Sequence, residues 1–130
     1  MKILFVCKYN RFRSKVAEAY FRKINKNNKI KVASVGIFKG IPTPEKVINI
    51  GKKLGIKISK NTKGLREEYL NEFDIIVVVA DNVPKYFFKG AKKVVKWNIP
   101  DVSHDDTKNI EKIMKKIFKK VNKLNKRLEK

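Results

Sequence analysis

Residues 2–24 read KILFVCKYNRFRSKVAEAYFRKI, and this stretch decides the fold. Its first part, Lys2 to Val6, is a short apolar run that is typical of a buried β-strand. From about Ser14 to Ile24 the apolar residues recur at helical spacing, which predicts an amphipathic helix. A polar loop with Cys7 at its start and Arg13 at its end joins the two elements. The stretch therefore predicts the first half of a βαβ unit.

The rest of the chain continues the alternation of strands and helices. Further apolar runs predict strands at Ile30 to Ser34, Asp74 to Val79 and Lys93 to Lys96, and helical sequence separates each strand from the next. The valines at 77–79 are typical of a strand that is buried on both faces, as in parallel sheets. We therefore predict an α/β fold around a four-stranded, mainly parallel sheet.

The other predicted helices are placed by capping residues and apolar periodicity. A second helix is expected to begin at Thr43-Pro44, with Thr43 as N-cap, and to end at Leu54-Gly55. Shorter helical turns are expected near 66–71 and 83–88. The last helix should begin near Asp105 and Asp106, and its spacing favours a core-facing helix over a nucleic-acid-binding or membrane-binding one. Its apolar stripe is Ile110, Ile113, Met114, Ile117, Val121, Leu124 and Leu128.

Composition limits the classes of protein that the chain can represent. With 130 residues and 42% hydrophobic residues, we expect one domain over residues 1–130. No apolar run approaches the roughly 20 residues of a membrane span, and none resembles a signal peptide, so we expect a cytoplasmic protein without membrane attachment. The net charge of +21 favours anionic partners. Because no RNA-binding or zinc-finger pattern accompanies that charge, we expect only weak, salt-sensitive nucleic-acid binding.

The loop between the first strand and the first helix carries the candidate chemistry. In α/β sheets this turn commonly binds phosphate, because the helix that follows presents free N–H groups. The spacing Cys-x5-Arg lets the backbone from Lys8 to Arg13 curl around an anion, with the Arg13 guanidinium gripping two of its oxygens. The same groups favour the thiolate form of Cys7, which Ser14 can stabilise by a hydrogen bond. Asn10 can brace the loop backbone.

The alternative is that Cys7 is a small buried residue at a strand end. It is the only cysteine, which excludes an internal disulfide and a multi-cysteine zinc site. A phosphate loop requires a strand before the cysteine, a helix after it, and the arginine and serine found here as Arg13 and Ser14. This chain has all four features. This coincidence favours a nucleophile.

The segment FVCKYNRFRSKVAEAYF resembles the signature of the low-molecular-weight protein tyrosine phosphatases and of the arsenate reductases that share their fold. The similarity continues through VASVG, LGIKIS, EFDIIVVV and WNIPD, so it covers nearly the whole chain. It implies a parallel sheet of strand order 2-1-3-4, helices on both faces, and Cys7 and Arg13 as nucleophile and phosphate clamp. The expected substrate-binding loop residues are Lys8, Tyr9, Asn10, Arg11, Phe12 and Ser14.

A phosphatase of this kind also needs a carboxylic acid that protonates the leaving oxygen. The resemblance assigns this role to Asp101, which follows the fourth predicted strand and should lie at the same edge of the sheet as Cys7. Two alternatives stay open. Asp101 could be a simple turn residue, or Asp105 or Asp106 could be the acid.

Other positions depart from the family pattern. The family usually follows its Asp with Pro and aromatic residues, whereas this chain has Val102-Ser103-His104, so phosphotyrosine specificity is not implied. Phe38 is a candidate replacement for the aromatic wall of the substrate cleft. His104 is either a wall residue or a helix-entry residue, with the second favoured. Trp97 is expected to anchor the acid loop.

The sequence thus predicts a phosphatase that acts on phosphate monoesters, with protein phosphotyrosine or aryl phosphate as the expected substrate, through a phosphocysteine on Cys7 and with Asp101 as general acid and base. Phosphorylated proteins or small phosphate esters are the expected partners. No cofactor or metal is expected, because backbone dipoles and Arg13 supply the positive charge. An arsenate reductase that uses an external thiol is the nearest alternative. A non-catalytic module that binds phosphate or nucleic acid is a second one. The oligomeric state is not indicated.

Overall fold

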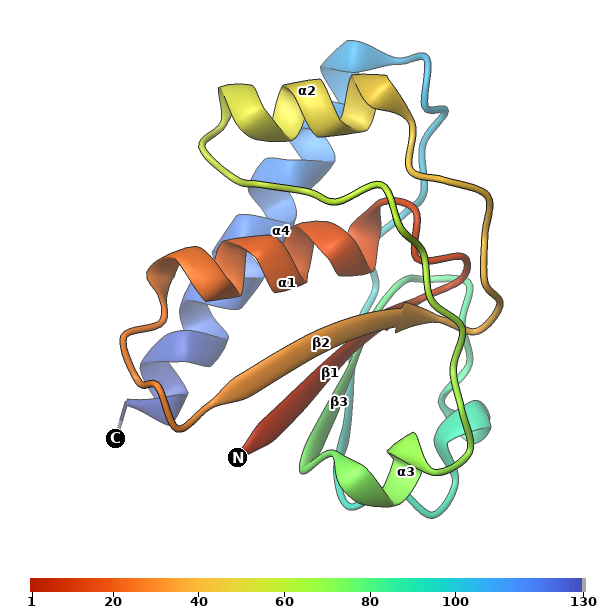
Figure 1. Cartoon of the computed structure of the whole chain (residues 1–130), viewed down its shortest axis with the longest axis vertical. Helices are drawn as coiled ribbons and strands as arrows, with labels where there is room; N and C mark the ends of the chain where they lie inside the picture. The colour runs from red at the N-terminus through yellow and green to blue at the C-terminus, as the bar shows by residue number, and fades with distance from the viewer. Residues whose placement is uncertain (130) are drawn as a thin grey trace.

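The computed structural model describes residues 1–129 as an α/β protein (Figure 1). Its strands and helices follow the predicted alternation along the chain. The elements are β1 (Lys2–Cys7), α1 (Arg13–Ile24), β2 (Lys31–Gly36), α2 (Glu45–Lys53), α3 (Tyr69–Glu72), β3 (Ile75–Val79), the 3-10 helix η1 (Lys85–Phe88), β4 (Val94–Trp97) and α4 (Thr107–Leu128).

The four strands form one parallel sheet in the order β2-β1-β3-β4, as predicted. β1 pairs with β2 from Lys2 opposite Lys31 to Cys7 opposite Gly36. β3 lies on the other side of β1 and pairs in turn with β4. Every residue of β3 is buried, as expected for a central strand of a covered parallel sheet.

Alternate residues of the central strands supply two hydrophobic clusters, one on each face of the sheet. Ile3 and Phe5 point into the larger cluster, which contains the buried faces of α1, α2 and α4. Leu4 and Val6 point into a smaller cluster under α3 and η1. Figure 1 shows the same division, with α1, α2 and α4 on one side of the sheet and α3 on the other. The prediction of helices on both faces is confirmed.

The Lys-rich helix α4 packs onto the core, as its periodicity predicts. Five residues of the predicted stripe are buried, from Ile110 to Val121, and Leu124 and Leu128 pack against them. Tyr20 of α1 stacks on Phe118 of α4, with ring centroids 4.1 Å apart. No helix among residues 1–129 is both long enough and apolar enough to cross a membrane.

Three helix starts differ from the prediction. α2 begins at Glu45 with Pro44 as its N-cap, and the Thr43 hydroxyl is buried without a partner among the described residues, so the predicted Thr43 cap is wrong. The turn expected at 66–71 becomes a helix only at Tyr69. The turn expected at 83–88 starts at Lys85, with Pro84 as its N-cap in an extended conformation. The last helix has the predicted acidic start, since the Asp106 carboxylate accepts a hydrogen bond from the Asn109 amide at 3.2 Å.

Candidate active site

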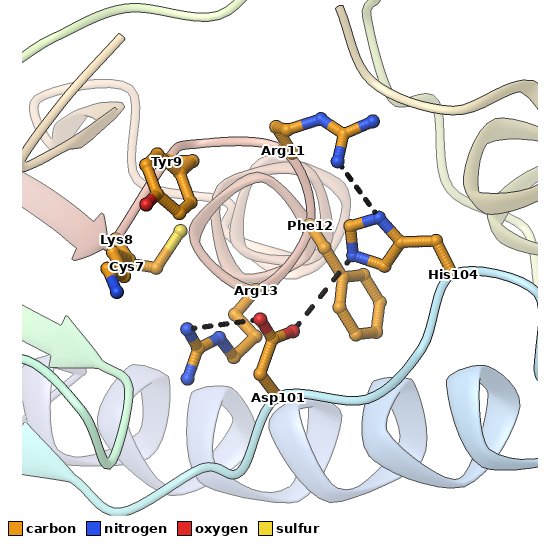
Figure 2. Close-up of a pocket in the computed structure, with 8 residues that line it drawn as sticks. All are labelled: Cys7, Lys8, Tyr9, Arg11, Phe12, Arg13, Asp101 and His104. Atoms are coloured by element: carbon orange, nitrogen blue, oxygen red, sulfur yellow. Dashed lines mark hydrogen bonds and ion pairs between the residues drawn. The ribbon is translucent and has the colours of Figure 1, made fainter. Parts of the chain in front are cut away.

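A cavity opens where the loop after β1 meets the loop after β4, at the carboxyl edge of the sheet. Figure 2 shows the side chains around it. Six come from the segment at the end of β1 and the start of α1, and two come from the loop that precedes α4. They are Cys7, Lys8, Tyr9, Arg11, Phe12, Arg13, Asp101 and His104.

The Cys7 sulfur is held by a short chain of polar side chains behind the loop. Its Sγ lies 3.0 Å from the Ser14 hydroxyl. That hydroxyl accepts a hydrogen bond from the Asn10 amide nitrogen at 2.8 Å, so its own hydrogen is free to point at the sulfur. A thiolate at Cys7 would therefore find a donor already in place. Ser14 and Asn10 are buried and support the loop from behind, without lining the cavity.

Asn10 also fixes the path of the loop backbone. It has a positive φ of 58°, in the left-handed region that Asn tolerates better than most residues. Its side-chain oxygen accepts a hydrogen bond from the Lys63 amide at 2.9 Å, and its nitrogen donates to the Ser34 hydroxyl at 3.1 Å. Gly36 makes room for this arrangement, because a Cβ there would lie 2.6 Å from the Asn10 nitrogen and 2.5 Å from the Phe38 carbonyl oxygen.

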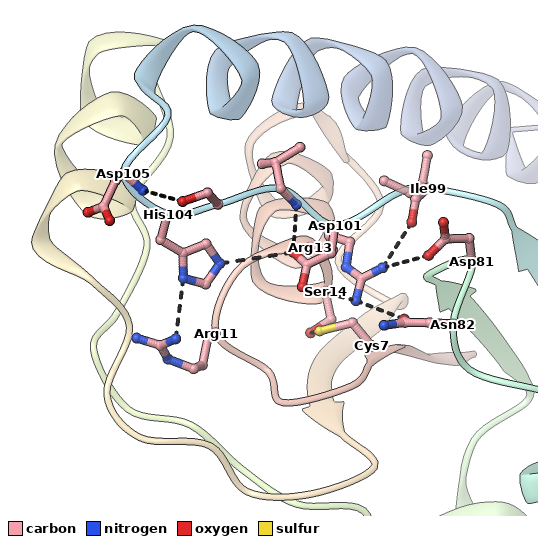
Figure 3. A network of polar contacts seen from close by, with 12 residues as sticks. Cys7, Arg11, Arg13, Ser14, Asp81, Asn82, Ile99, Asp101, His104 and Asp105 are labelled. Carbon is pink, nitrogen blue, oxygen red and sulfur yellow. Dashed lines mark hydrogen bonds and ion pairs between the residues drawn. The ribbon is translucent and has the colours of Figure 1, made fainter.

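Arg13 is buried, with 2% of its surface exposed, and its guanidinium is oriented by the ends of β3 and β4 (Figure 3). Nη1 donates to the Ile99 carbonyl at 2.9 Å and to Asp81 at 3.4 Å. Nη2 donates to Asn82 at 3.0 Å. Nε donates to no acceptor within residues 1–129. Nε can therefore donate to a bound anion, and Nη2 can join it in a bidentate contact in exchange for its 3.8 Å ion pair with Asp101.

Lys15 lies buried just behind this loop, in the first turn of α1. Its ammonium donates to the Ser59 hydroxyl at 3.0 Å and to the Asn61 carbonyl oxygen. Burial lowers the pKa of Lys15 below its ordinary value, while Glu18 opposes that shift and a charge on Cys7 would oppose it too.

Asp101 is the one of the three candidate carboxylates that lines the cavity. Its side chain is 47% exposed, and its Oδ2 lies 3.8 Å from Nη2 of Arg13. Its Oδ1 accepts a hydrogen bond from the Val102 amide at 3.0 Å. Asp106 caps α4 instead, and Asp105 is not among the lining residues. The geometry therefore favours Asp101 over Asp105 and Asp106 as the candidate acid.

Besides Asn10 and Ser14, which were expected to bind substrate but do not line the cavity, two predicted positions differ from expectation. The His104 ring lies in the cavity wall, whereas the sequence favoured a helix-entry residue. It packs edge-on against the Phe12 ring, with ring centroids 5.8 Å apart. Phe38 lies outside the cavity, more than half exposed, with its ring centroid 6.0 Å from that of Tyr9. Trp97 is buried and packs on Phe5, as an anchor for the acid loop should.

Sequence reasoning missed the partners of Arg13. Asp81 and Asn82 follow β3 with only Ala80 between, and polar residues at the carboxyl end of a central parallel strand are a usable signal for a site. The burial of Lys15 could not be predicted from the sequence, since its hydrogen-bond acceptors come from residues 59–61, far along the chain. No group of three or more His, Cys, Asp or Glu side chains in the described chain is placed to hold a metal ion.

Comparison with known structures gives the same overall fold. A low molecular weight protein tyrosine phosphatase from T. tengcongensis is 26% identical, with a TM-score of 0.80 over 98% of this chain and 99% of that one. An arsenate reductase from Archaeoglobus fulgidus is 26% identical, with a TM-score of 0.76 over 95% and 98% of the two chains. The arginine phosphatase YwlE from Geobacillus stearothermophilus is 18% identical, with a TM-score of 0.85 over 98% and 92%.

Sequence comparison identifies the family directly. No match was found among curated protein sequences. The profile of the family described as low molecular weight phosphotyrosine protein phosphatase, however, matches residues 2–130, nearly the whole length. With its parallel sheet and its loop between Cys7 and Arg13, the chain belongs to the low molecular weight phosphotyrosine protein phosphatase family.

Proposed function

We propose that this protein hydrolyses phosphate monoesters of aryl alcohols, including protein phosphotyrosine, through a phosphocysteine intermediate on Cys7. One observation carries the proposal: a single cavity is lined by the Cys7 thiol, by the Arg13 guanidinium, whose Nε has no acceptor within residues 1–129, and by the Asp101 carboxyl. These are the nucleophile, the phosphate clamp and the proton donor that the reaction needs.

In the first step, the Cys7 thiolate attacks phosphorus while Arg13 and the loop N–H groups hold the phosphate oxygens. An S–P bond forms as the P–O bond to the leaving group breaks. Asp101, in its protonated form, transfers its proton to the leaving oxygen, so that an alcohol or phenol departs.

In the second step, a water molecule attacks the phosphocysteine. Asp101, now a carboxylate, takes a proton from the water, and the P–S bond breaks. Inorganic phosphate leaves, the Cys7 thiolate is restored, and Asp101 is again protonated. The Ser14 hydroxyl stabilises the departing sulfur through the 3.0 Å contact. No metal is needed, because Arg13 and the loop dipoles offset the phosphate charge.

Arsenate reduction is the second candidate, because arsenate is a tetrahedral oxyanion of the same charge and the A. fulgidus structure shares this fold. The chain has no second cysteine to relay electrons, so an external thiol would have to supply them. Thiol-dependent arsenate turnover faster than ester hydrolysis would favour this candidate.

A reducing compartment suits the proposed chemistry, since Cys7 has to stay a free thiolate. We therefore propose a cytoplasmic location and phosphorylated proteins or small phosphate esters as substrates. The high positive charge adds a weak affinity for nucleic acid that should weaken steeply with salt. Tight binding that persists at high salt would contradict a purely electrostatic contact.

The test is hydrolysis of 4-nitrophenyl phosphate without divalent metal, with wild type beside Cys7→Ser and Asp101→Asn. We expect no turnover by Cys7→Ser and a loss of about 10²-fold or more for Asp101→Asn. Asp105→Asn, a change in a neighbouring carboxylate outside the cavity, is the matched control and should keep wild-type activity. An inactive but folded wild type, or a Cys7→Ser variant that still turns over, would overturn the proposal.

A further inference from the structure

His104 lies between a cation and the candidate acid. Its Nδ1 lies 3.2 Å from Nη1 of Arg11, and its Nε2 lies 4.0 Å from Oδ1 of Asp101. Figures 2 and 3 show the three side chains in a row along one wall of the cavity. The row joins the loop after β1 to the loop before α4.

The contact with Arg11 decides which ring nitrogen of His104 carries the hydrogen. A guanidinium has only donors, so Nδ1 of His104 has to accept. In the neutral ring, Nε2 then carries the hydrogen and presents it toward Oδ1 of Asp101. Arg11 is itself fixed, because its Nε and Nη2 donate to the Ile41 and Pro42 carbonyls at 3.2–3.3 Å.

The two oxygens of Asp101 consequently meet different surroundings. Oδ1 already accepts from the Val102 amide and faces the Nε2 hydrogen of His104. Oδ2 faces Arg13, which is the phosphate side of the cavity. If Oδ1 of Asp101 stays a hydrogen-bond acceptor, the proton of the carboxylic acid has to lie on Oδ2. Oδ2 is the oxygen that faces the expected position of the leaving group.

We propose that His104, held by Arg11, is a positioning residue that directs the protonated oxygen of Asp101 toward the leaving group. This inference rests on the proposed phosphatase function. It assigns a role to His104 and Arg11 that the Cys7 and Arg13 signature does not include.

The charges around His104 are consistent with a neutral ring. Burial lowers its pKa below the ordinary value, and Arg11 and Arg13 lower it further, while Asp101 and Asp105 oppose the shift. Below that lowered pKa, a second ring hydrogen would occupy Nδ1 and remove the acceptor for Arg11. The row of contacts is therefore intact at neutral pH and is lost only in more acidic solution.

Leaving-group dependence separates positioning of the acid from a merely structural role. Phenyl phosphate needs a proton on its leaving oxygen, whereas 2,4-dinitrophenyl phosphate releases a stable anion and needs little help. We expect His104→Ala to slow phenyl phosphate several-fold, because it removes the Nε2 hydrogen that faces Oδ1 of Asp101 across 4.0 Å, and to change 2,4-dinitrophenyl phosphate less than about twofold. His104→Gln keeps an N–H donor and should recover part of the loss.

Arg11 provides an independent arm of the test. If it acts through His104, Arg11→Ala should lower the phenyl-to-dinitrophenyl rate ratio in the same direction. The double variant should then show no lower ratio than His104→Ala alone. Competitive inhibition by inorganic phosphate reports the loop itself, and it should stay unchanged in His104→Ala.

The outcomes distinguish this inference from the function on which it rests. If wild type is active and Asp101→Asn shows the leaving-group signature, but His104→Ala slows all substrates equally or none, the positioning role is wrong and the phosphatase stands. If wild type hydrolyses neither ester, both proposals fall together.

Discussion

Nη2 of Arg13 lies 3.8 Å from Oδ2 of Asp101, so the proposed phosphate clamp and the candidate acid form an ion pair. A phosphate bound at Nη2 of Arg13 would compete with Oδ2 of Asp101 for the same guanidinium nitrogen.

Arg13→Lys should abolish most of the activity. A Lys ammonium cannot grip two oxygens with a planar fork, and it also loses the contacts to Asn82 and the Ile99 carbonyl. We expect a fall of about 10²–10³-fold in kcat/KM together with weaker inhibition by inorganic phosphate. Arg22→Lys, at an exposed ion pair with Glu18, is the control. Equal effects of the two changes would contradict a special role for Arg13.

Ser14→Ala should slow breakdown of the phosphocysteine more than its formation. The hydroxyl stabilises the sulfur when it carries negative charge, and sulfur is the leaving group of the second step. We expect a burst of phenol release followed by a steady rate lower by about tenfold, the effect of one lost hydrogen bond. Rapid-mixing kinetics would measure both phases. A slower burst with an unchanged steady rate would contradict this assignment.

Gly36→Ala should distort the phosphate loop. The added methyl group would overlap the Asn10 nitrogen, which is backbone and cannot rotate away. We expect a loss of about 1–3 kcal/mol in the free energy of unfolding and weaker phosphate binding. Gly90→Ala is the control, since its φ of +97° makes any side chain strained while its surroundings are open. It should lower stability and leave phosphate affinity unchanged.

Stability should depend on pH through Lys15. Because its pKa is lowered in the folded protein, the unfolded chain binds more protons at this site between that lowered value and 10.5. The free energy of unfolding of wild type, measured relative to Lys15→Met, should therefore rise as pH increases through this window. Denaturant titrations of both proteins at several alkaline pH values would measure it. A constant difference would show that burial does not perturb Lys15.

The strands and the phosphate loop could be predicted because their signals are local. The valines of β3 and the run from Lys2 to Val6 are apolar over a strand length, and Cys7 and Arg13 are six residues apart. Asp101 was accessible through its position after β4, since carboxyl ends of parallel strands share one edge of the sheet.

The remaining features depend on contacts between distant segments. Asp81 orients Arg13 from another strand, and His104 enters the cavity because of the path taken between β4 and α4. Neither of these placements follows from the spacing of apolar residues in the sequence. The Thr43 cap failed for a related reason, since a capping hydroxyl also needs the backbone dihedral angles of the N-cap position, which Pro44 occupies here. Such features require the three-dimensional arrangement.

The parallel sheet has a practical consequence for handling the protein. The cavity lies at the carboxyl edge, whereas β1 begins at the opposite edge, and α4 runs back to end there, where Arg127 and Leu128 line a hollow together with Ile75 and Lys93. Figure 1 shows the start of β1 and the end of α4 on that side. An affinity tag, a fluorophore or a surface tether at either end should leave the cavity mouth unobstructed, so immobilised protein can be presented to bulky phosphorylated proteins.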